Sequence, residues 1–493
     1  MHRDAIPRSL SPRFLSLRSV NPCSLNPCRL SPDSRIARRL SSCALAGLVL
    51  LVLAGCEVRG VEGEATGTDE GASGGIRQAL ASEIDAELRS NLDMWYPRVV
   101  DSVYGGYLSN FTYDWQEMDG QEKFVVTQAR HVWTLSKMAA RYPDRERYAG
   151  YAAHGADFLR EAMWDSTYGG FFQTVTREGH AIPSGQDETT KTLYGNAFAI
   201  YGLAALYGLA QDDDVLDLAR DAFLWLDEHA YDPVHGGYFQ PLAQDGTPSR
   251  PGYPKDYNSG IHILEALAEL YTVWPDSLLR ERLEEVFYIV RDTMVAEEGY
   301  LKLYFDAEWN HLSYRDSAEA VIRGNLNRDH ITPGHDIETA FLLLESAHVL
   351  GIGDDPETHR IAKALTDHTL ESGFDEEAGG VYDVSYRFPG DAVPTVVRDT
   401  KEWWGQAEAL HTLAIMANLY PNDPRGYLGT LRKQWDYITT HLLDREHGGW
   451  YDHGLDTSPD SRRGRKSQIW KGNYHTVRSM AGVLDQLNEQ PLR

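Results

Sequence analysis

Two His-x-x-Glu pairs stand out in the sequence, His262 with Glu265 and His335 with Glu338. Residues three apart share one face of a helix, so each carboxylate can fix the tautomer of its imidazole and raise its basicity. Such a pair suits general acid–base catalysis. The same spacing can also bind a carboxylate-bridged metal, but that requires more glutamates on facing helices, where the sequence has tryptophan and arginine. We therefore expect no metal.

Other polar and aromatic residues stand at the beginnings of alternate helical segments. They are Arg130, Lys191, Tyr194, Asn196, Asn258, Trp403, Trp404, Glu408, Trp470, Tyr474 and His475. If these segments form one ring, the side chains meet in one cavity at its mouth. Glu408 and Arg130 can equally form a structural ion pair. His131, His235, His411 and His447 lack this placement, and we interpret them as structural.

A sixfold repeat supplies the elements that position these residues. An acid, three residues, Gly-Gly and then an aromatic residue or valine recur from Asp101, Asp165, Asp232, Asp375 and Asp444, and Glu298-Gly299-Tyr300 is a degenerate copy. The first glycines are at 105, 169, 236, 299, 379 and 448. This period fits two helices and a short β-hairpin, with the glycines serving a positive-φ turn.

Apolar residues recur at helical spacing in paired segments between the turns. The twelve segments lie near 76–94, 123–141, 145–163, 189–209, 212–229, 257–273, 275–295, 333–351, 355–371, 399–419, 424–442 and 471–489. They predict an all-α fold over 76–490, an (α/α)6 barrel with short β-hairpins at the Gly-Gly turns. The even-numbered segments are less charged and should form the inner ring. An open solenoid is less consistent with the sequence because no polar capping repeat is visible.

The N-terminal segment has the features of a targeting signal. Residues 1–55 contain an apolar run, 44–54, that is too short to span a bilayer as a helix but suits a signal segment. The following Leu53-Ala54-Gly55-Cys56 resembles the lipobox of bacterial lipoproteins, which implies lipidation at Cys56 and, with Glu57 next, the outer membrane. Residues 56–75 should form a flexible tether. A cleaved signal with a chance cysteine is the alternative.

Composition excludes several classes of function. The net charge of -26 disfavours nucleic acid and anionic lipid surfaces as partners, so membrane association should come only from the anchor at Cys56. All four cysteines lie at or before position 56, which leaves the main body without a disulfide, a cysteine nucleophile or a zinc cluster. No nucleotide-binding or serine-hydrolase motif occurs in a suitable context. No cofactor is expected, and an uncharged ligand is favoured.

Six ordered blocks resemble the N-acylglucosamine 2-epimerase superfamily, especially its cellobiose 2-epimerase and mannose isomerase branch. The blocks are 127–130, 191–198, 258–266, 333–338, 401–408 and 470–475. The resemblance implies an (α/α)6 barrel and a cofactor-free reaction at C2 of a reducing sugar. It assigns acid–base roles to His335 and His475, assisting roles to His262 and Glu338, and places Arg130 near the reacting oxygens. Trp470 and one of Trp403 and Trp404 match tryptophans that stack on sugar rings.

Three departures from the family pattern leave the sugar open. The last block reads Gly-Asn-Tyr-His-Thr, where the disaccharide epimerases usually have Cys-Pro-Tyr-His-Asn. Pro333 replaces their usual tyrosine, and the segment from about Tyr314 to Arg328 looks inserted. The resemblance therefore implies a reducing monosaccharide or disaccharide as the substrate, such as cellobiose or mannobiose, without fixing which.

The chemistry fits the residues. A histidine has a pKa suited to removing the C2 proton, and Arg130 supplies a cation for the enediolate oxygen. Histidines on both faces would invert C2, whereas return of the proton to C1 would give a ketose. We favour the epimerase over the aldose–ketose isomerase. The rivals are a glycoside hydrolase, which needs two opposed carboxylic acids, and a sugar-binding lipoprotein without catalysis.

Overall fold

The computed structural model describes residues 67–143, 145–182, 191–248 and 254–488. The predicted leader, Cys56 and the first part of the predicted tether lie outside the described residues. The first helix, α1 (Gly67–Trp95), begins earlier than the predicted residue 76. Adding residues to an existing helix costs little compared with nucleating one, so the apolar segment after Ile76 can carry a polar N-terminal extension.

Six inner helices alternate along the chain with six outer helices, as the apolar spacing predicts. The inner helices are α2 (Val125–Arg141), α4 (Leu193–Ala210), α6 (Tyr257–Val273), α10 (Pro333–Leu350), α12 (Trp403–Leu419) and α14 (Tyr474–Leu487). The outer helices are α1, α3 (Arg147–Phe158), α5 (Asp213–His229), α7 (Ser277–Tyr288), α11 (Pro356–Ser372) and α13 (Tyr427–Tyr437). Three outer helices end in π-helical turns, η1 (Leu159–Met163), η2 (Ile289–Met294) and η3 (Ile438–Leu442).

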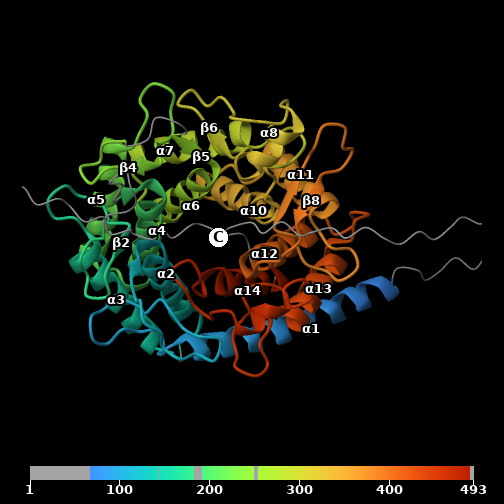
Figure 1. The fold of residues 1–493 in the computed structure, drawn as a ribbon. Helices are drawn as coiled ribbons and strands as arrows, with labels where there is room; N and C mark the ends of the chain where they lie inside the picture. Colours follow the sequence, from blue (N-terminus) through green and yellow to red (C-terminus); the bar gives the residue numbers. More distant parts are fainter. Residues whose placement is uncertain (1–66, 144, 183–190, 249–253, 489–493) are drawn as a thin grey trace, which may run out of the picture. The chain divides into compact units, whose positions relative to one another are not determined.

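The inner helices close into a ring. Each packs against the next in chain order, and α14 packs back against α2 (Figure 1). Each outer helix packs mainly against one inner helix, α1 against α14 and α3 against α2 for example. This arrangement confirms the all-α (α/α)6 barrel.

The inner helices are buried because their residues are apolar or small. Among the described helices, α4 alone is long and apolar enough to span a membrane, and 78% of it is buried inside the protein. Gly202 of α4 lies so close to α2 that a Cβ atom would come within 2.6 Å of the Ala129 carbonyl oxygen. A side chain there would force the two inner helices apart.

The predicted β-hairpins at the Gly-Gly turns are very short, and longer β-structure lies elsewhere. Across the Gly-Gly turns the two arms share single bridges, such as Trp164 with Phe171. The two-residue ladders instead join successive repeats: β1 (Lys123–Phe124) pairs with β2 (Thr174–Val175), β3 (Lys191–Thr192) with β4 (Pro241–Leu242), and β5 (Lys255–Asp256) with β6 (Tyr304–Phe305). Among the described residues, only β7 (Val384–Tyr386) and β8 (Thr395–Arg398) form a longer pair.

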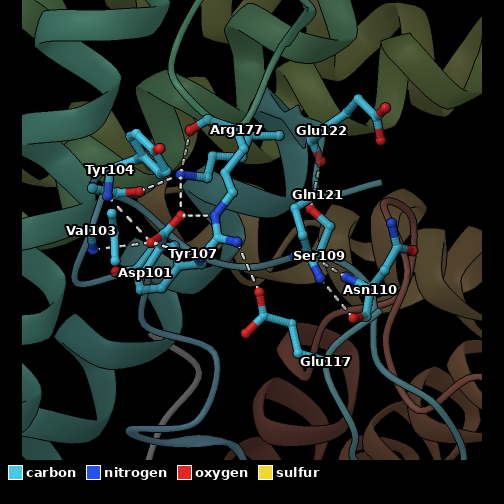
Figure 2. A network of polar contacts seen from close by, with 12 residues as sticks. Asp101, Val103, Tyr104, Tyr107, Ser109, Asn110, Glu117, Gln121, Glu122 and Arg177 are labelled. Atoms are coloured by element: carbon cyan, nitrogen blue, oxygen red, sulfur yellow. Dashed lines mark hydrogen bonds and ion pairs between the residues drawn. The ribbon is translucent and has the colours of Figure 1, made fainter. Parts of the chain in front are cut away.

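A buried lysine ties each of five turns to the segment that leads into the next inner helix. Its ammonium lies 2.6 to 3.0 Å from the turn aspartate in the pairs Lys123–Asp101, Lys191–Asp165, Lys255–Asp232, Lys401–Asp375 and Lys466–Asp444. In the first repeat Arg177 also donates to Asp101 and to Glu117 (Figure 2). Lys191 is therefore part of the scaffold and does not face the cavity.

The segment that looks inserted, about 314–328, holds two short helices, α8 (Glu319–Gly324) and α9 (Leu326–Asp329). Asp329 anchors it: its carboxylate accepts hydrogen bonds from Ser313 Oγ at 2.8 Å and from the Tyr314 amide at 2.7 Å. The segment therefore has a defined conformation immediately before His335.

A 3-10 helix, η4 (Pro459–Arg463), precedes α14.

Candidate active site

The predicted site residues converge on the N-terminal turns of the inner ring. Arg130 of α2 donates to the Tyr194 hydroxyl of α4 at 3.0 Å, and the Tyr194 ring lies 5.3 Å from the His262 imidazole of α6. Trp404 of α12 packs against His335 of α10. Residues that are far apart in the sequence thus line one region of the barrel.

The first His-x-x-Glu pair forms as its spacing predicts. His262 Nδ1 lies 2.9 Å from Glu265 Oε2, and both side chains are almost completely buried. The other carboxylate oxygen accepts hydrogen bonds from the Tyr474 hydroxyl and from Arg478. Burial alone would raise the pKa of Glu265, but the Arg478 charge and the hydrogen bond with His262 outweigh it and lower the pKa. Glu265 is therefore a carboxylate that holds His262 in place.

The second pair does not form, which corrects the prediction from its spacing. Glu338 accepts a hydrogen bond from Arg478, and His335 Nδ1 instead lies 3.2 Å from the Tyr257 hydroxyl. A shared helix face allows two side chains to meet, but the arginine charge on α14 attracts the carboxylate more strongly than a neutral imidazole does. Burial, together with the nearby His262 and His475, lowers the pKa of His335 well below its usual value.

His475 pairs with Glu408 across two helices. Its Nδ1 lies 2.5 Å from Glu408 Oε1, and the Glu408 side chain is fully buried. The pair replaces the Glu338 contact as the second imidazole–carboxylate unit of the site. Burial lowers the pKa of His475 well below its usual value. Nε2 remains as the ring nitrogen of His475 that is free of this contact.

Arg478 is the central residue that the sequence analysis missed. Its guanidinium contacts Glu265, Glu338 and Glu408, and its side chain is 5% exposed. Arg478 lies three residues after His475 and four after Tyr474, so helical spacing placed it on the same face. That spacing was the available signal.

The carboxylates around Arg478 also bear on the metal alternative. Ligand atoms of Glu338, Glu408 and His475 lie within 4.8 Å of one another, a separation that a metal ion can bridge. The Arg478 guanidinium already donates to both glutamates. The cluster thus has a cation of its own, and the absence of a metal stays a prediction.

The predicted sugar-binding residues have different environments. Trp404 faces the histidines, whereas Trp470 is 48% exposed and packs on Phe124 with ring centroids 4.5 Å apart. Trp403 is buried, with the Lys471 ammonium 5.0 Å from its ring. Trp404 and Trp470 are therefore the tryptophans best placed to meet a ligand.

The two asparagines also differ. Asn196 Oδ1 accepts a hydrogen bond from the Phe171 amide at 2.7 Å, and its Nδ2 donates one to the Thr192 carbonyl at 2.9 Å. Both ends of the side chain are therefore hydrogen-bonded to the backbone. Asn196 is placed to shape the turn. The Asn258 side-chain oxygen is buried and has no hydrogen-bond partner within the described residues, which leaves it available to a ligand.

Comparisons with known proteins agree with this fold. The family model described as N-acylglucosamine 2-epimerase (GlcNAc 2-epimerase) matches residues 106–479. A cellobiose 2-epimerase of Bacteroides fragilis is 28% identical over 83% of this chain and 100% of its own length. The structure of the cellobiose 2-epimerase from Spirochaeta thermophila matches with a TM-score of 0.72 and 29% identity, covering 84% of this chain and 97% of the other. A D-mannose isomerase structure, at 21% identity, a TM-score of 0.70 and coverage of 82% and 97%, shares the fold.

Proposed function

The chain belongs to the N-acylglucosamine 2-epimerase family, and from that premise we propose that it is a carbohydrate 2-epimerase acting on a reducing aldose without a cofactor. Relatives named cellobiose 2-epimerase match over most of their length. The substrate class is therefore a reducing monosaccharide or disaccharide, held with its open-chain aldehyde end inside the barrel.

One observation carries the proposal: two imidazoles from different helices meet the same indole. The Trp404 ring lies 4.4 Å from His335 and 6.0 Å from His475, centroid to centroid. Burial lowers the pKa of both histidines, and the Arg130 charge lowers it further. Two bases and a nearby cation match the needs of proton removal next to a carbonyl group.

The reaction then needs only these groups. One histidine removes the C2 proton from the open-chain aldose, and the electrons of the C2–H bond form the enediolate, whose oxygen Arg130 stabilises. The other histidine returns a proton to C2 from the opposite face. The product is the C2 epimer, and no redox change or added group is required.

The second candidate is an aldose–ketose isomerase on the same site, favoured by the likeness in fold to the D-mannose isomerase structure. It differs only in that the proton returns to C1. Glycoside hydrolysis has less support, because Glu265, Glu338 and Glu408 converge on one guanidinium and do not face each other across a scissile bond.

The test is C2 exchange in deuterated water. The purified barrel is incubated with cellobiose, mannobiose, mannose, glucose or N-acetylglucosamine, and products are followed by NMR. Deuterium at C2 with formation of the epimer supports the proposal, a ketose supports the isomerase, and chain shortening or no exchange with any sugar contradicts both.

The two histidines give the matched variants. His335→Ala and His475→Ala should each lower turnover more than tenfold, a loss above about 1.4 kcal/mol, while leaving the fold intact. His348→Ala, on the solvent-exposed end of α10, is the control and should keep turnover. Retention of more than about a tenth of the rate in either active-site variant would contradict the two-histidine mechanism.

A further inference from the structure

Glu338 and Glu408 share one guanidinium nitrogen. Arg478 Nη2 contacts Oε1 of both residues, and both side chains are 0% exposed. The second oxygen of each, Oε2, is buried and has no hydrogen-bond partner within the described residues. Two carboxyl groups with unsatisfied oxygens thus lie side by side in the barrel.

The charges around this pair do not balance if every acid is ionised. The groups that face it are Glu265 and His262 on α6, Arg130 on α2, Tyr194 on α4, and His475 and Arg478 on α14. With neutral histidines, two arginines oppose three glutamates. An uncompensated buried charge is costly, so the site favours keeping one proton on a glutamate. The charge on Glu265 is already fixed by Arg478 and His262.

We propose that Glu338 and Glu408 share one proton in the resting site, and that His475 relays it from Glu408 at its Nδ1 to C2 of the sugar at its Nε2. The inference rests on the proposed epimerase function, and it assigns the source of the proton that completes the inversion. His475 acts as the relay because its Nδ1 contacts Glu408 at 2.5 Å.

The proton transfers balance. His335, whose Nδ1 is occupied by Tyr257, takes the C2 proton at Nε2. The enediolate carbon then takes the proton from His475 Nε2, while the Glu408 proton moves to His475 Nδ1. The histidine thus passes on a proton without accumulating charge. Afterwards His335 carries one extra proton and the glutamate pair has lost one; water returns it before the next turnover.

The acidity of the pair agrees with this storage role. Burial, with repulsion from Glu408, raises the pKa of Glu338 to about 7. Burial likewise raises the pKa of Glu408 to about 7, against the opposing effect of Arg478. A pair of this kind gains and loses one proton near neutral pH.

Glu338→Gln separates the relay from a structural role. The amide removes one negative charge, so Glu408 stays ionised and His475 keeps its proton on Nδ1, acting only as a base. Each epimer should then exchange its own C2 hydrogen with deuterated water within about threefold of the wild-type rate, while conversion between epimers falls more than tenfold. Equal loss of exchange and conversion, or conversion within threefold of wild type, would overturn the relay. Glu338→Asp keeps the titratable group and should restore part of the conversion.

Infrared spectroscopy tests the stored proton without activity. The wild type should show the carbonyl stretch of a protonated carboxyl group near neutral pH that disappears at alkaline pH and is missing in Glu338→Gln. Glu345→Gln is the matched control, because burial raises the pKa of Glu345 to about 8 and this residue lines a cavity of about 540 Å³ that Arg478 also lines but Glu338 and Glu408 do not. It should lose only its own band and keep turnover. If the wild type exchanges no sugar at C2, the proposed function fails; if Glu338→Gln leaves the spectrum unchanged, the shared proton fails.

Discussion

Trp404 packs its indole against the imidazole of His335, with ring centroids 4.4 Å apart and ring planes inclined by 41°. The indole Nε1 donates to Glu402 Oε2 at 2.6 Å, which fixes the ring at the start of α12. Because the same ring lies 6.0 Å from His475, a ligand that reaches both imidazoles must run along this indole.

Trp404 and Trp470 should therefore have different kinetic roles. Trp404→Ala should lower kcat at least tenfold, because His335 loses the surface that orients it. Trp470→Ala should raise KM about tenfold, the value of one aromatic contact of about 1.4 kcal/mol, with kcat within about threefold. Steady-state kinetics on the substrate found by C2 exchange measures both. A large fall of kcat in Trp470→Ala would contradict its placement at the exposed mouth.

Arg478 should contribute strongly to the stability of the folded protein as well as holding the glutamates of the site in place. Arg478→Met should lower the free energy of unfolding by about 3–5 kcal/mol, because it leaves three buried carboxyl groups without their cation. The loss should shrink as the pH falls below about 7, since the pKa of Glu338 and of Glu408 is about 7 even beside Arg478 and both groups then take up protons. Urea unfolding at several pH values measures it. Arg360→Met, which removes an exposed pair with Glu357, is the control and should be nearly neutral.

The sequence predicted the barrel well because its repeat combines two independent signals, a helical apolar period and a Gly-Gly turn. What the sequence did not predict is which partner each individual side chain contacts. Spacing put Glu338 on the face of His335, but its contact is Arg478, 140 residues away in the chain. The sequence predicts Lys191 and Asn196 at the mouth of the barrel. In the structure, Lys191 instead pairs with Asp165, and Asn196 bonds to the backbone. Packing between repeats decides which of several possible partners a side chain contacts, and no local sequence pattern encodes that packing.

The pair Lys191–Asp165 provides a test of the turn scaffold. Burial would raise the pKa of Asp165, but hydrogen bonds from Lys191 and Gln244 lower it. A lowered folded pKa stabilises the protein above the unfolded pKa of about 3.9, and the contribution is lost as the pH falls below that. Lys191→Met should therefore destabilise the protein at pH 7 and have a smaller effect at about pH 3. Adding Asp165→Asn should recover part of the loss, whereas an unchanged deficit in the double variant would contradict the pairing.

Removal of metal ions should leave activity unchanged. The guanidinium of Arg478 already supplies the positive charge that the glutamates need, so the proposed reaction has no step for a metal. The enzyme is dialysed against EDTA, and C2 exchange is measured with and without added Mn²⁺ or Zn²⁺. Activity that falls on chelation and returns with metal would assign Glu338, Glu408 and His475 to a metal site instead.

The final prediction concerns Cys56, which lies outside the described residues. We propose that it carries a lipid, so Cys56→Ser should move the protein out of the membrane fraction or leave an uncleaved precursor. The other three cysteines precede it, so the change removes no disulfide or thiol from the barrel, and the specific activity of the purified barrel should be unaltered. Fractionation with and without detergent, in the presence and absence of globomycin, measures the anchor. A wild-type protein that is soluble without detergent and processed despite the inhibitor would favour an ordinary cleaved signal. The enzyme would then meet its sugar free in solution, because the tether would no longer hold the barrel at a membrane surface.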